Sequence, residues 1–261
     1  MRAREVLLAA DCVAGYGLYL DLVAPLVAGK PELRSGMMKE VARVESAIET
    51  AMAGRSCALV SSGDPGIYAM AGLVFESCAL KGIRVLRPDD DANPAEGPAL
   101  QLEVVPGVPA LCAGAALLGA PLTHDFAVVS LSDLLTPWER IAERLEAAAR
   151  ADFVVVIYNP RSRKRDWQLG RARDILLAHR PPETPVGIVR AAMRPEQEVR
   201  IVELSALDPE TVDMQTTLFV GSRSSGRYLE FMYTPRGYAG KYALGGSILD
   251  TGSSMLDKDV P

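Results

Sequence analysis

The segment CALVSSGDPGIYAMAGLVFE, residues 57–76, decides the fold class. A short apolar run leads into Ser-Ser-Gly-Asp-Pro-Gly and then into helix-like sequence, so the pattern predicts a strand, a tight turn and a helix. Gly63 and Gly66 allow backbone angles that other residues avoid and let a ligand approach the main chain. Asp64 and Pro65 are favoured where a helix starts. Since ligands of open α/β sheets bind at the carboxyl ends of strands, this turn is either a ligand site or an ordinary, well-capped connection.

Composition limits the classes of protein to which the chain can belong. It has 261 residues, of which 49% are hydrophobic and 23% charged, as expected for a globular protein of one large or two ordinary domains. No apolar run has the length of a membrane span, and the N-terminal segment lacks the pattern of a signal peptide. The net charge of −5 argues against a general nucleic-acid binder. We therefore expect neither a nucleic-acid nor a membrane partner.

The metal-binding and redox-active residue types are few and scattered. Cys12, Cys57, Cys78 and Cys112 form no Cys-x-x-Cys pair and have apolar neighbours, as expected for buried, reduced thiols of a cytoplasmic protein. The chain has only two histidines, and the acidic run Asp89–Asp91 lies in a proline-rich segment typical of a surface loop. We expect no metal site.

Hydrophobic periodicity predicts two α/β halves. A turn is expected at Gly15–Gly17, and the clearest amphipathic helix, residues 37–53, ends at Gly54. Strands are expected at 12–14, 57–61, 83–86 and 102–105 in the first half and at 126–131, 153–158, 186–189, 198–203 and 216–221 in the second, the last two antiparallel to their neighbours; further helices are expected at 2–11, 110–120, 138–150 and 167–179. The predicted domains are residues 1–119 and 120–242, and 243–261 read as a flexible tail.

The unusual residues of both halves lie in turns at strand ends: Gly-Asp-Pro-Gly at 63–66, Pro-Gly-Val-Pro at 106–109 and Tyr-Asn-Pro at 158–160. The chain has neither a G-x-G-x-x-G nor a G-x-x-x-x-G-K-[ST] segment, so a Rossmann dehydrogenase and a P-loop NTPase are poorly supported. It also lacks the G-x-S-x-G elbow of the α/β hydrolases.

Taken together, these turns resemble those of the tetrapyrrole (corrin/porphyrin) methyltransferases. The resemblance is carried by GYGLYLDL at 15–22, SSGDPGIYAMAGLVFE at 61–76, VPGVPALCAGAALLGAPLTHDFAVVSLSDLLTPWE at 105–139, FVVVIYNPRSRKR at 153–165, TPVGIVR at 184–190, TTLFVGS at 216–222 and TPRGY at 234–238. It implies two α/β domains of the tetrapyrrole methylase type, with S-adenosylmethionine bound in the cleft between them. It also implies a homodimer that methylates ring carbon 17 of a precorrin, with ring contraction, in cobalamin biosynthesis.

The resemblance implies which residues contact the cofactor. They lie in the first turn, in the second turn, after the strand at 153–158, and at two later strand ends. The set is Ser62, Gly63, Asp64, Ile67, Pro109, Ala110, Asn159, Ala192 and Thr217.

Substrate and catalytic residues are expected mainly in the second half. Arg161, Arg163 and Lys164 are the candidates to bind the carboxylates of a precorrin, because basic side chains, arginine above all, bind carboxylates. The common alternative is that these charges form a solvated surface run. Tyr16 is a candidate for the wall of a macrocycle site, or else core. His124 is the candidate acid or base for ring contraction, or else a structural histidine.

The chain departs from the family at its start. Members of the family begin with a strand and a glycine-rich loop ahead of the segment that matches RAREVLLAAD at 2–11. Either the true start lies upstream or the protein lacks part of its site. We expect a misplaced start, so that upstream in-frame residues raise the melting temperature and the affinity for cofactor. The alternatives are another precorrin methyltransferase of the pathway and a non-catalytic tetrapyrrole-binding paralogue.

Overall fold

The computed structural model describes residues 2–242 and residue 244. It divides into two units, Met1–Ala110 and Leu111–Pro261. The division falls nine residues before the boundary predicted at residues 119/120, because the helix that starts at Ala110 packs on the sheet of the second unit. The predicted tail, residues 243–261, lies outside the described residues except for Leu244.

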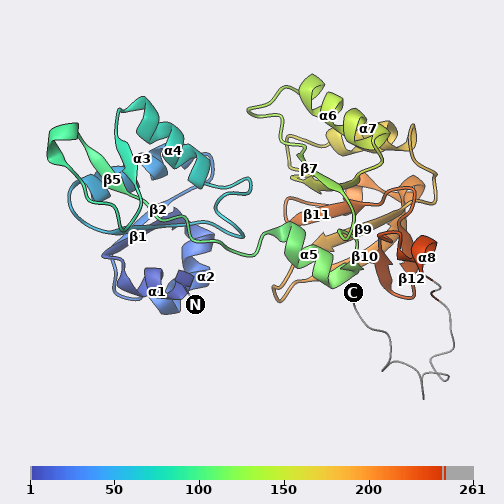
Figure 1. Cartoon of the computed structure of the whole chain (residues 1–261), viewed down its shortest axis with the longest axis horizontal. Coiled ribbons are helices and arrows are strands. Elements are labelled where there is room, and N and C mark those ends of the chain that lie inside the picture. The colour runs from blue at the N-terminus through green and yellow to red at the C-terminus, as the bar shows by residue number, and fades with distance from the viewer. Residues whose placement is uncertain (1, 243, 245–261) are drawn as a thin grey trace, which may run out of the picture. The chain divides into compact units, whose positions relative to one another are not determined.

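The first unit is built on a parallel sheet of three strands in the order β2-β1-β3. Helices α1 and α2 pack on one face of this sheet and α3 and α4 on the other (Figure 1). A second, two-stranded parallel sheet, β4-β5, joins the α3 and α4 side. The elements of this unit are α1 (Arg2–Ala9), β1 (Cys12–Tyr16), α2 (Gly17–Val27), β2 (Glu32–Ser35), α3 (Glu40–Met52), β3 (Cys57–Val60), α4 (Ala71–Leu80), β4 (Arg84–Leu86) and β5 (Ala99–Gln101).

Two predictions in the first unit are wrong. The expected turn at Gly15–Gly17 is instead the end of β1 and the start of α2. The expected strand at 102–105 is not formed, and the strand of that region is β5. Leu102 donates its N–H to the Leu86 carbonyl, but residues 103–105 have no strand partner within the described chain, and β3 pairs with β1 alone. A strand needs a hydrogen-bonded neighbour, which an apolar pattern by itself does not supply.

The second unit contains a mixed sheet in the order β10-β9-β11-β8-β7. Strands β7 and β8 are parallel, while β11 runs antiparallel to β8 and β9, and β10 antiparallel to β9. This confirms the prediction that the last two strands oppose their neighbours. The elements are α5 (Ala110–Leu118), β6 (Gly119–Ala120), β7 (Phe126–Ser130), α6 (Trp138–Arg150), β8 (Val154–Tyr158), α7 (Gln168–Leu177), β9 (Pro185–Arg190), β10 (Glu198–Glu203), β11 (Thr216–Val220), β12 (Gly226–Tyr228), β13 (Phe231–Tyr233) and α8 (Tyr238–Lys241).

The main core of the second unit lies between the sheet and helices α6 and α7, with α5 on the opposite face (Figure 1). Alternate residues of β8, β9 and β11 face each side of the sheet, and both sides are covered, so nearly every residue of these strands is buried. On the α5 side, a Cβ added at Gly114 would lie 2.7 Å from the ring of Phe219. Helix α5 therefore approaches the sheet closely through a residue without a side chain.

Candidate functional site

The Gly-Asp-Pro-Gly turn in the first unit is organised by Asp64. One carboxylate oxygen, Oδ1, accepts a hydrogen bond from the Gly66 N–H at 2.8 Å, and Oδ2 accepts one from the Gly107 N–H at 3.0 Å. Asp64 was predicted to cap the following helix, and this is wrong, because α4 starts only at Ala71 with Met70 at its N-cap. Both oxygens are used to hold the turn in place and to tie it to the second turn, at 106–109.

The two turns pack with their main chains in contact. A Cβ at Gly107 would lie 2.0 Å from the Gly63 carbonyl oxygen, a distance that no side chain tolerates. Gly63 has φ +73°, and a Cβ there would point at the Cα of Pro109, 3.5 Å away. The hydrogen bonds from Gly107 and Gly66 lower the pKa of the Asp64 carboxyl from 3.8, so it is ionised at neutral pH. The structure thus brings together six residues of the predicted cofactor set: Ser62, Gly63, Asp64, Ile67, Pro109 and Ala110.

Two more polar side chains lie at the carboxyl ends of β1 and β3, where the first turn begins. Tyr16 ends β1 next to the end of β3, since Gly15 pairs with Val60. Its ring meets that of Tyr19 edge-on, with centroids 5.3 Å apart. Ser61, at the start of the turn, has a buried hydroxyl without a hydrogen-bond partner among the described residues. A buried polar atom without a partner suits a ligand that brings its own polar groups.

The second unit gathers its predicted site residues at one end of the mixed sheet. Asn159 directly follows β8, and Ala192 follows β9 by two residues. Thr217 lies in β11 opposite Val189, near the same end, because β11 runs antiparallel to β9. Three segments that are far apart in sequence therefore place Asn159, Ala192 and Thr217 at the same end of the mixed sheet.

Strained backbone marks this end of the sheet. Asn159 has φ +51°, Ala191 +47° and Met193 +60°, in the left-handed region that residues other than glycine rarely adopt. Asparagine tolerates this region, but for Ala191 and Met193 it costs about 1–3 kcal/mol each and persists only where the surroundings impose it. The turn after β9 is thus held in a conformation that the sequence does not favour locally.

Arg165, the last residue of the basic run RSRKR that was expected to meet substrate carboxylates, is instead buried at this end of the sheet. Its guanidinium group is buried and donates from Nε to the Asn159 carbonyl oxygen at 3.0 Å, while Asn159 donates from Nδ2 to Ser130 Oγ at 2.9 Å. Burial lowers the pKa of Arg165 from 12.5, and the charge of Asp133 opposes that shift. The available signal was its place as the last basic residue of RSRKR, six positions after Asn159.

The remaining basic residues of that run differ in whether their charges are paired within the unit. Arg161 donates to the Pro209 carbonyl oxygen at 2.9 Å and pairs with the Glu210 carboxylate, so its charge is used within the unit. Arg163 and Lys164 are exposed and form no ion pair within the described chain. Of the predicted substrate contacts in this run, these two are the available ones.

His124 lies at the other end of the mixed sheet. It precedes β7 by two residues, whereas Asn159 follows β8, and the two strands are parallel with Phe126 opposite Val154. A strand of five residues, roughly 17 Å at about 3.3 Å per residue, therefore separates the two ends. Within this unit the structure does not bring His124 together with Asn159, Ala192 and Thr217.

Among the described residues, no three His, Cys, Asp or Glu side chains gather as the ligands of a metal ion would. None of the described helices combines the length and the apolar character of a membrane-spanning segment. Cys112 is exposed, so the prediction of four buried thiols is wrong at this position.

Comparison with known proteins agrees with this architecture. Residues 1–208 match the model of the family described as Tetrapyrrole (Corrin/Porphyrin) Methylases. The chain resembles the crystal structure of the methyltransferase CobJ with a TM-score of 0.80 and 36% identity, over 90% of this chain and 92% of that one. The protein belongs to the tetrapyrrole methylase family.

Three relatives are similar to this chain over most of its length. The chain is 44% identical to a probable cobalt-factor III C(17)-methyltransferase of Salmonella typhimurium, over 91% of this chain and 92% of the relative. It is 40% identical to a precorrin-3B C(17)-methyltransferase of Sinorhizobium sp, over 90% of each chain. A cobalt-factor III methyltransferase of Priestia megaterium is 44% identical over 93% of this chain, which spans 43% of that longer protein.

Proposed function

We propose that this protein transfers a methyl group from S-adenosylmethionine to ring carbon 17 of a tetrapyrrole, with ring contraction, in cobalamin biosynthesis. The substrate is precorrin-3B or its cobalt-containing equivalent, cobalt-precorrin-3 or cobalt-factor III. The observation that carries the proposal is the identity of 44% and 40% to the two C(17)-methyltransferases of similar length, which match about nine-tenths of each chain.

The cofactor proposal rests on the fit of the two turns in the first unit. S-adenosylmethionine carries a carboxylate, an ammonium group and a nucleoside, so main-chain N–H and C=O groups suit it. Gly63 and Gly107 keep the main chain uncovered by side chains, and the Ser61 hydroxyl has no partner within the described chain. We propose that Ser62, Gly63, Asp64, Ile67, Pro109 and Ala110 bind the cofactor together with Asn159, Ala192 and Thr217. Its position between the two units stays a prediction.

The chemistry needs alignment more than proton transfer. The cofactor, when bound, supplies a methyl group already activated by a sulfonium. A tetrapyrrole carbon next to ring nitrogens is enamine-like and nucleophilic, so the protein mainly has to hold it in line and exclude water. The fixed turns at Asp64 and Asn159 provide such rigidity. His124 lies at the opposite end of its sheet from Asn159, so the arrangement gives no support for a catalytic role.

Arg163 and Lys164 are the proposed contacts for substrate carboxylates. The double variant R163A/K164A should weaken tetrapyrrole binding about tenfold while leaving the affinity for S-adenosylmethionine unchanged, because a hydrogen bond to a charged group contributes about 1.5–3 kcal/mol. The control R150A/R171A removes two exposed positive charges from the same unit at helices α6 and α7. Equal weakening by both variants would show a general charge effect and refute the assignment.

The function is tested by incubating the purified full chain with methyl-labelled cofactor and each candidate precorrin, with and without cobalt. The proposal predicts transfer of one label and a ring-contracted product methylated at carbon 17. Transfer to a different carbon would identify another precorrin methyltransferase, and cofactor binding without any transfer would identify a non-catalytic paralogue. We further propose a cytoplasmic homodimer, which sedimentation at several protein concentrations tests for its oligomeric state.

A further inference from the structure

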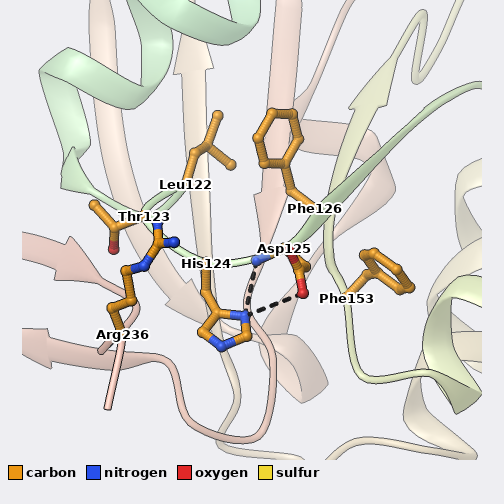
Figure 2. A pocket seen from close by; sticks show the side chains of 7 residues that line it. All are labelled: Leu122, Thr123, His124, Asp125, Phe126, Phe153 and Arg236. Carbon is orange, nitrogen blue, oxygen red and sulfur yellow. Dashed lines mark hydrogen bonds and ion pairs between the residues drawn. The ribbon is translucent and has the colours of Figure 1, made fainter. Parts of the chain in front are cut away.

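A cavity lies within the second unit, at the end of the mixed sheet that is remote from Asn159. Its volume is about 430 Å³. Figure 2 shows His124 near its centre, with Arg236 on one side and the rings of Phe126 and Phe153 on the other; it is lined by Leu122, Thr123, His124, Asp125, Phe126, Phe153 and Arg236. The proposed methyl transfer uses none of these residues.

The frame of this cavity is fixed by a strand pairing. Ala120 in β6 pairs with Tyr233 in β13, and the Thr234 N–H continues the ladder by donating to the Ala120 carbonyl oxygen at 3.0 Å. The Thr234 hydroxyl donates to the Pro121 carbonyl oxygen at 2.7 Å, and the Thr123 hydroxyl donates to the Thr234 carbonyl oxygen. These bonds hold the segment that carries His124 beside the segment that carries Arg236, although the two are more than a hundred residues apart.

Two hydrogen-bond donors, His124 and Arg236, line the cavity. The Asp125 N–H donates to Nδ1 of His124 at 2.8 Å, so the neutral imidazole carries its proton on Nε2 and presents an N–H there. Arg236 is exposed and makes no hydrogen bond or ion pair within the described part of the chain, which leaves the five N–H donors of its guanidinium group available. A carboxylate is the ligand group that suits both donors.

The remaining residues that line the cavity indicate the shape and charge of the rest of the ligand. Phe126 is 41% exposed, and Phe153, which directly precedes β8, lines the same cavity, so the two rings offer an apolar surface for a flat group. The Asp125 carboxylate, 81% exposed and 3.8 Å from Nδ1 of His124, adds a negative charge at the rim. That charge disfavours a dianion such as phosphate more than a ligand with a single negative charge.

We propose that this cavity binds a small organic monocarboxylate with a flat apolar body. The guanidinium of Arg236 and the Nε2–H of His124 bind the carboxylate, and Phe126 and Phe153 pack against the body. The site is distinct from the cofactor residues of the second unit, because it lies at the opposite end of the strands.

Histidine-selective NMR of the full chain tests this proposal with benzoate as the probe. The sequence has only two histidines, and His179, which lies 2.7 Å from Glu146, serves as the internal reference. Benzoate should shift the His124 ring signals saturably and leave those of His179 unchanged. Benzamide, which lacks the charge, and inorganic phosphate, which lacks the ring and is largely dianionic, should each bind at least about fivefold more weakly.

Variants at exposed positions complete the test. R236Q should weaken benzoate binding about tenfold and R236K by less, because lysine keeps the charge but not the planar fork. The control R171Q removes an exposed arginine elsewhere in the unit and should change nothing. The proposal is overturned if the His124 signals do not saturate with benzoate, if phosphate binds as tightly as benzoate, or if R236Q binds benzoate like the wild type.

Discussion

Asp64 is the residue on which the turn of the first unit depends, because its two carboxylate oxygens serve Gly66 and Gly107. In D64N the side chain has one acceptor in place of two, and its new NH₂ faces an N–H. We expect D64N to lower the melting temperature and to weaken S-adenosylmethionine binding at least about fivefold. Calorimetric titration with the cofactor measures the second effect, and unchanged affinity would remove Asp64 from the cofactor site.

The same side chain makes a prediction about pH. The folded pKa of Asp64 lies below the ordinary 3.8, so its stabilising contribution is present above pH 3.8 and disappears as the pH falls through the lower folded pKa. Wild type and D64N should therefore differ in melting temperature at pH 6 and converge as the pH falls below about 3.8. A difference that is constant across this range would mean that the charge of Asp64 contributes nothing.

Gly107 is required because of its neighbour and not because of its own backbone angles. In G107A the new methyl would lie 2.0 Å from the Gly63 carbonyl oxygen, so one of the two turns must move. We expect a loss of about 2–4 kcal/mol in the free energy of unfolding. The control is G72A in α4, where a Cβ meets nothing within 4 Å and alanine should gain about 0.5–1 kcal/mol. Urea denaturation of both variants measures the contrast, and a neutral G107A would contradict the close packing.

At the scale of elements, the close packing of α5 on the mixed sheet predicts how G114A changes stability. G114A places a methyl 2.7 Å from the buried ring of Phe219, so overpacking should cost about 1–3 kcal/mol although alanine favours helices. F219L removes the ring that is in the way. We expect the double variant G114A/F219L to be at least about 1 kcal/mol more stable than the sum of the single effects predicts. Additive effects in urea denaturation would contradict this contact.

The elements that sequence predicts well are those whose period reflects a single buried face. Helix α6 (Trp138–Arg150) and strand β10 (Glu198–Glu203) have the bounds that the pattern indicates. The start of α4 was missed by several residues, because the apolar residues 67–70 resemble a helical turn locally. Tyr68 in this segment has φ +51°, which a helix does not accommodate, and Asp64 bonds to Gly107, 43 positions away, where it does not cap a helix. A local pattern carries no information about either feature.

The same reason limits prediction of the site. Glycines and prolines at strand ends indicate the turns at 63–66 and 106–109, since few other residues adopt those conformations. The left-handed Ala191 carries no such signal, because a tertiary contact, its N–H bond to the Gln215 carbonyl, helps to impose its angles. The bond from Arg165 to the Asn159 carbonyl is of this kind, and in the sequence Arg165 looks like one more charge in a basic run.

At the scale of the whole molecule, each unit has cores of its own. Val13, Leu20 and Ala58 belong to one cluster of the first unit and Val44 and Cys78 to another, whereas the cluster in the second unit is larger. The first unit also leaves one edge of β3 without a partner strand among the described residues. Larger cores stabilise a domain more, so the first unit should unfold at the lower temperature.

This order of unfolding is measurable because Trp138 and Trp167, the only two tryptophans, both lie in the second unit, with ring centroids 5.0 Å apart. Tryptophan fluorescence should report only the later transition, while circular dichroism reports both. If cofactor contacts come from both units, as proposed, S-adenosylmethionine at a hundred times its dissociation constant should add about 2.7 kcal/mol to the stability of the liganded state and bring the two transitions together. A cofactor that raises only the early transition would confine its site to the first unit and remove Asn159, Ala192 and Thr217 from it.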